Sequence, residues 1–95
     1  MKIQAERGVA TIDELDDFTS LSLEIIGPQD AAIGPWGRWV DSAHVAIGPH
    51  ILLELAGDVA DDPDWRDRFS SMISYARTKG WSDEYGAVRI HVANL

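Results

Sequence analysis

Residues 61–80 read DDPDWRDRFSSMISYARTKG and decide the fold, because they encode a complete amphipathic helix. The apolar side chains recur with the 3.6-residue period of an α-helix and form one stripe. We expect this stripe to lie flat against a sheet and to leave the other side of that sheet open. The stripe consists of Trp65, Phe69, Met72, Ile73 and Ala76.

Both ends of this helix are also encoded. Asp62 can cap the first turn, and Pro63 suits the first helical position. Arg77 and Lys79 lie at the negative end of the helix dipole. Gly80 is placed to adopt the left-handed conformation that ends a helix. The sequence therefore predicts a helix that begins after Asp62 and ends before Gly80.

The segment before this helix begins with a predicted strand, a helix and a second strand. Residues 2–10 carry loosely spaced apolar side chains and predict an opening strand. Thr11 and Glu14 match the capping box, so we expect a short helix over residues 11–19. Residues 20–26 alternate between apolar and polar side chains, the pattern of a half-buried strand.

The middle and the end of the chain add a hairpin, a helix and a last strand. Glycine and proline in residues 27–37 predict a loop. Residues 38–40 and 44–47 predict the two arms of a hairpin. A short helix is expected over residues 50–56, and a cleanly alternating strand over residues 88–92.

This order predicts one α+β domain over residues 1–95. We expect a two-layer sandwich with a small, mostly antiparallel sheet and two to three helices on one face. The alternation of the strands then assigns a set of polar side chains to the open face of the sheet. These are Ser22, Glu24, His44, Arg89 and His91.

Composition limits the classes of partner. The formal net charge is −8, which disfavours direct binding to nucleic-acid phosphates and to anionic membranes. The chain has no cysteine, which excludes thiolate nucleophiles and sulfur-ligated zinc. No signal-peptide core and no membrane span is visible, so we expect a cytoplasmic protein. Residue usage rich in Ala, Asp, Val, Gly and Arg is typical of a GC-rich bacterial genome.

The histidines are the candidates for catalysis. His44 and His91 fall on predicted strands and could share the open face with Arg89 and Glu24. A histidine beside a carboxylate can act as a general base, and an arginine can stabilise developing negative charge. The alternative interpretation is two solvated histidines on a sheet. No close spacing of metal ligands occurs, so we expect neither a metal site nor a cofactor.

Negative charge concentrates in two segments. Acidic residues cluster between Asp13 and Asp17 and again between Asp58 and Asp67. If the two segments are adjacent, they form one anionic surface that could bind a basic partner or mimic nucleic-acid phosphates. The alternative is an acidic surface without a special role.

Two tryptophans flank the glycine-rich loop. Trp36 and Trp39 could cover an apolar pocket under residues 27–37, or could belong to a protein interface with Glu24 nearby. Trp36 could also fold into the core.

No catalytic motif is present, so the leading prediction is a small, acidic protein that acts by binding. Its partner would be another protein or a second copy of itself in a homodimer. The first alternative is a cofactor-independent isomerase, cyclase or lyase with His91 or His44 as base in a pocket under residues 27–37. Arg89 would lie beside the base, and the substrate would be a small apolar molecule. The second alternative is an inhibitor that mimics nucleic acid.

Overall fold

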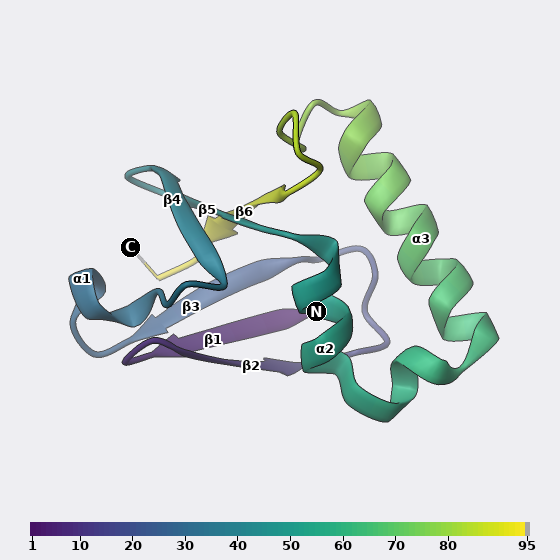
Figure 1. The fold of residues 1–95 in the computed structure, drawn as a ribbon, viewed down its shortest axis with the longest axis horizontal. Coiled ribbons are helices and arrows are strands. Elements are labelled where there is room, and N and C mark those ends of the chain that lie inside the picture. The colour runs from purple at the N-terminus through teal and green to yellow at the C-terminus, as the bar shows by residue number, and fades with distance from the viewer. Residues whose placement is uncertain (95) are drawn as a thin grey trace.

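The computed structural model describes residues 1–94. Six strands form one mixed sheet in the order β2-β1-β3-β6-β5-β4 (Figure 1). The strands are β1 (Lys2–Glu6), β2 (Val9–Asp13), β3 (Ser22–Ile26), β4 (Gly37–Asp41), β5 (His44–Ile47) and β6 (Val88–Val92). The helices are α1 (Gln29–Ala32), α2 (Pro49–Ala56), the 3-10 helix η1 (Gly57–Asp61) and α3 (Pro63–Thr78).

Most strand pairs are antiparallel. β1 pairs with β2, β4 with β5, and β5 with β6 in this way. The two parallel pairs join β3 to β1 and to β6 at the centre of the sheet. The predicted α+β architecture, with helices packed against one layer of mostly antiparallel strands, is confirmed.

One face of the sheet forms the hydrophobic core together with the helices. The strands contribute alternate residues to it, as the half-buried pattern predicts. Burial of these apolar side chains is the main stabilising contribution to the fold. The buried residues include Ile3, Ala5, Leu23, Val45, Ile47, Val88, Ile90 and Val92 from the sheet and Leu52, Trp65, Phe69 and Ala76 from the helices.

The central prediction of a helix at α3 is confirmed at both ends. The backbone N–H of Asp64 donates to Asp62 Oδ1 at 3.0 Å, and Pro63 is the first helical residue. The helix ends at Thr78, and Gly80 has a φ of +76°.

The stripe of α3 faces the interior, but much of it packs against a loop. The indole Nε1 of Trp65 donates to the Leu15 carbonyl at 2.8 Å, and the Phe18 ring lies 5.7 Å from the Trp65 ring. Figure 1 shows α3 running along one end of the sheet while α2 crosses its face. Both Met72 and Ile73 stay half-exposed.

The predicted helix over residues 11–19 is wrong. Thr11 lies inside β2, and Glu14 has a left-handed φ of +55° that starts a turn. Residues 2–10, predicted as one strand, instead contain the hairpin turn between β1 and β2. Pairing along the whole of β1 satisfies the backbone of β2, and this outweighs the local capping signal.

Residues 27–36 form a loop that contains the short helix α1. The loop is tied to the β1–β2 turn, because the Gly8 N–H donates to the Ala32 carbonyl at 3.1 Å. The indole of Trp36 donates to the Gly8 carbonyl at 2.8 Å. A Cβ on Gly34 would collide with this carbonyl and with the Trp36 ring, so the close approach requires glycine.

Candidate functional site

The open face of the sheet carries the polar residues assigned to it from the sequence. Ser22 pairs with His91, and His91 pairs with His44, so these three side chains lie side by side across three strands. Arg89 pairs with Ala46, and Glu24 follows Ser22 on the same face of β3. The strand order thus brings together residues that are far apart in the chain.

The two histidines form a close pair. The centroids of the His44 and His91 rings are 5.4 Å apart, at an interplanar angle of 59°. Asp41 Oδ1 lies 2.8 Å from the Nδ1 atom of His44. Hydrogen bonds lower the pKa of Asp41; the backbone N–H of Ala43 has the largest effect and the His44 side chain the next largest. The carboxylate therefore stays ionised and orients the His44 ring.

The other predicted members of this site have separate contacts. Glu24 forms an ion pair with Lys2, with 2.9 Å between Oε2 and Nζ. The backbone N–H of Arg89 donates to the Trp81 carbonyl at 2.7 Å, and its side chain is exposed. The larger hollows of residues 1–94 are lined by neither His44 nor His91.

The two tryptophans of the glycine-rich region have different surroundings. Trp36 is held by Gly8 and packs against the core. Trp39 lies on β4 and borders a shallow hollow of about 670 Å³ between α1 and the edge of the sheet. This hollow is open, and Gln29, Asp30, Asp41 and Ser42 line it together with Trp39.

A deeper apolar groove lies at the other end of the molecule. Its volume is about 580 Å³, and it separates the second half of α3 from the segment that precedes β3. We call it the aromatic groove. Its lining residues are Phe18, Thr19, Ser20, Leu21, Met72, Tyr75, Ala76, Trp81, Val88 and Arg89.

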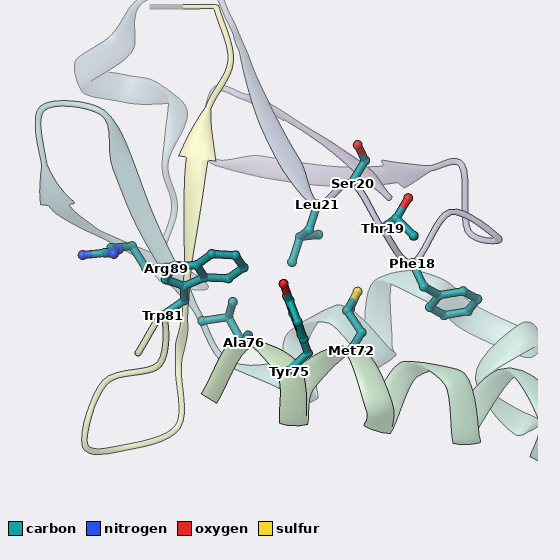
Figure 2. A pocket seen from close by; sticks show the side chains of 10 residues that line it. Phe18, Thr19, Ser20, Leu21, Met72, Tyr75, Ala76, Trp81 and Arg89 are labelled. Carbon is teal, nitrogen blue, oxygen red and sulfur yellow. The ribbon is translucent and has the colours of Figure 1, made fainter. Parts of the chain in front are cut away.

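Figure 2 shows how the aromatic groove is built. Met72 and Tyr75 rise from α3 toward Leu21, and the indole of Trp81 closes one end beside them. The guanidinium of Arg89 is directed away from the groove. The Tyr75 and Trp81 rings meet edge to face at 5.8 Å, yet remain 56% and 42% exposed. Exposed aromatic rings in a groove are typical of a binding surface.

The acidic segments meet beside this groove. The contact between Trp65 and Leu15 joins residues 13–17 to the start of α3, so the two segments form one region. We call residues 13–17 and 58–67 the acidic surface. They hold nine carboxylates against Arg66 alone, a charge of −8, while the rest of the chain holds seven acids and seven bases. The whole net charge of the protein therefore resides in the acidic surface.

Local hydrogen bonds keep part of the acidic surface ionised. The side chain and backbone N–H of Thr19 donate to Asp17 Oδ1 at 2.9 and 3.0 Å, and they lower the pKa of Asp17. Phe18 and Thr19 border both the aromatic groove and the hollow along residues 14–19. The two surfaces are thus continuous.

The sequence interpretation did not identify the aromatic groove. Tyr75 lies outside the stripe of α3 and Trp81 follows the end of the helix, so neither residue was predicted to line a site. A signal was present, since Tyr75 and Trp81 are large aromatic residues that the stripe does not include. The missing information was the position of residues 18–21, which only the tertiary fold provides.

Residues 1–94 contain neither a cluster of three metal ligands nor a helix that could cross a membrane. In this part of the chain, no group of three or more histidine, cysteine, aspartate or glutamate side chains is arranged to hold a metal ion. The helices are too short or too polar to cross a membrane.

Comparison with known proteins gives no relative. No family model matches the chain, and neither the curated proteins nor the solved structures include a significant match.

Proposed function

We propose that the protein is a non-catalytic binding module that docks a basic polypeptide segment. The observation that carries this proposal is the concentration of the whole net charge of −8 in the acidic surface, directly beside the exposed aromatic groove. An apolar centre with a charged rim is the usual arrangement of a protein interface.

The groove would supply most of the binding energy. Tyr75, Trp81 and Met72 offer large, half-exposed side chains that a partner could cover. Aromatic anchors of this type dominate the energetics of interfaces, whereas exposed charges contribute mainly to selectivity and to the rate of encounter. The partner segment should therefore present one or two apolar side chains followed by lysines or arginines.

The distribution of charge along the groove also predicts the orientation of the bound segment. At the other end of the groove the ammonium group of Lys79 lies 5.5 Å from the centre of the Tyr75 ring. The groove thus runs from an acidic end at residues 14–17 to a basic end at Lys79. The basic end of the bound segment would lie at residues 14–17.

A different chain fits this surface better than a second copy. Symmetric pairing of two copies through the acidic surface would place carboxylates against carboxylates. Self-association through the open sheet face stays a separate prediction, which sedimentation velocity at high protein concentration would test. Nucleic-acid mimicry is a narrower form of the same proposal, in which the basic partner is a nucleic-acid-binding protein.

Selection from random displayed peptides tests the proposal. We expect the enriched peptides to combine an aromatic or aliphatic anchor with several lysines or arginines. Binding of a selected peptide should fall at least tenfold in Trp81→Ala and in the double variant Asp64→Lys/Asp67→Lys. The control Glu6→Lys reverses a carboxylate on the open sheet face and should bind as the parent does.

Two results would contradict this function. One is the selection of neutral or acidic peptides. The other is a selected peptide whose affinity is unchanged in Trp81→Ala and in the charge-reversed variant, because such a peptide binds elsewhere.

Catalysis by a histidine base is the second candidate function. It is favoured by the contact between Asp41 and His44, which resembles the orientation of a general base. Within residues 1–94 neither ring lines one of the larger hollows that could hold a substrate, so binding is the stronger proposal.

A further inference from the structure

We infer that His44 and His91 form a bis-imidazole site for a borderline divalent transition metal such as Zn²⁺. The two residues are direct partners on the antiparallel strands β5 and β6, and their rings lie beside each other at a tilt of 59° on the open side of the sheet. This site is separate from the acidic surface and the aromatic groove. The sequence suggested no metal site, because the two residues are far apart in the chain.

The separation of the rings fits one shared ion. In a tetrahedral zinc site each Zn–N bond is about 2.0–2.1 Å long, so the centroids of two imidazoles on one ion lie about 5 Å apart. The His44 and His91 centroids are 5.4 Å apart. The His91 side chain is exposed, so neighbouring groups leave it room to turn one nitrogen toward the ion.

Asp41 prepares His44 for this role. An ionised carboxylate only accepts hydrogen bonds, so the His44 Nδ1 atom at 2.8 Å must carry the hydrogen. The Nε2 atom then keeps its lone pair for a metal. A carboxylate behind a histidine ligand is the common second layer of zinc sites, where it fixes the tautomer and the orientation of the ring.

The charge around the pair is mixed. Arg89 lies on the same face of β6, is exposed, and opposes a cation. Glu24 lies on the neighbouring strand and is paired with Lys2. Two protein ligands leave the remaining positions of the ion open to water or to a donor from a bound molecule.

Calorimetric titration of the full chain with ZnCl₂ tests this inference with a built-in control. The chain has three histidines and no cysteine, so the single variants His44→Gln, His91→Gln and His50→Gln cover every imidazole. We expect His44→Gln and His91→Gln each to weaken Zn²⁺ binding at least tenfold, and His50→Gln to leave it unchanged. Asp41→Asn should weaken Zn²⁺ binding by roughly 10-fold, because removal of the carboxylate that orients a histidine ligand has an effect of this size.

A second measurement separates the loss of Zn²⁺ binding from the loss of the folded state. Thermal unfolding of each variant without metal establishes whether it is folded, and added Zn²⁺ should raise the Tm of the parent but not of His91→Gln. Mg²⁺ should give no comparable heat, because it prefers oxygen ligands. Equal Zn²⁺ affinity in all three histidine variants, or equal binding of Mg²⁺, would assign the ion to carboxylates and overturn the inference.

Discussion

Single residues set the turns of this fold, and the first hairpin shows how. Arg7 and Gly8 both adopt left-handed conformations, with φ values of +50° and +81°. This pair forms the tight turn that matches the twist of two antiparallel strands. Glycine adopts such a conformation without strain, whereas arginine does so at a cost. The turn was not predicted because an arginine at its first position gives no signal.

The first prediction follows from the strain at Arg7. The substitution Arg7→Asn should raise the free energy of unfolding by about 0.5 kcal/mol, since asparagine tolerates the left-handed conformation. Gly8→Ala should lower it by about 1–2 kcal/mol. Urea denaturation of both variants measures these changes, and a destabilised Arg7→Asn would show that the arginine side chain has a contact of greater value.

The second prediction concerns Asp83 and acid pH. Burial of its carboxylate raises the pKa, but the backbone N–H groups of Ala87 and Tyr85, together with Arg38, outweigh it and hold the pKa below the ordinary range. A lowered pKa in the folded state means that the carboxylate stabilises the fold above its unfolded pKa of about 3.9 and loses this effect as pH falls through the folded value.

Asp83→Asn should therefore lower the urea midpoint at pH 7, and its difference from the parent should shrink as pH falls below about 4. The neighbouring Glu84→Gln removes the same charge without these hydrogen bonds and should leave the midpoint at pH 7 nearly unchanged. A constant difference between Asp83→Asn and the parent across the acid range would refute the assignment.

At the scale of the element, helix α3 was predictable and residues 11–19 were not. The helix at α3 combines a cap, a period and a stop, and these signals agree. Thr11 and Glu14 give only a capping signal for a helix. Ala10 and Ile12 alternate with polar residues, which favours a strand that pairs with β1. Where local signals conflict, the tertiary pairing decides.

The third prediction separates the two sides of α3. Phe69 is 3% exposed, and Phe69→Ala should destabilise the fold by about 3–5 kcal/mol. Tyr75, on the groove side of the same helix, is 56% exposed, and Tyr75→Ala should change stability by less than about 1 kcal/mol. Thermal and urea unfolding measure both. A large loss for Tyr75→Ala would mean that the ring supports the fold rather than a binding surface.

For the whole molecule, the layers of the fold were predicted correctly, but the positions of the acidic surface and the aromatic groove were not predictable from the sequence. Alternation in each strand assigns residues to a face, and this was enough to put His44, Arg89 and His91 together. It says nothing about the loop between β2 and β3. That loop brings Phe18 against Trp65 and thereby builds both the acidic surface and one wall of the aromatic groove. Such contacts depend on chain topology rather than on local pattern.

The last prediction uses this separation of charge and apolar contact within one molecule. Since the charge of −8 lies on the acidic surface, a selected basic peptide should be steered to it over long range. Between 0.1 and 1 M salt the Debye length falls from about 10 to about 3 Å, so the association rate should fall severalfold while the dissociation rate changes little. Trp81→Ala should instead raise the dissociation rate and leave the association rate nearly unchanged, because the contacts in the aromatic groove break only on dissociation. Stopped-flow measurements resolve the two rates, and salt acting on dissociation alone would show that the acidic surface does not steer the partner.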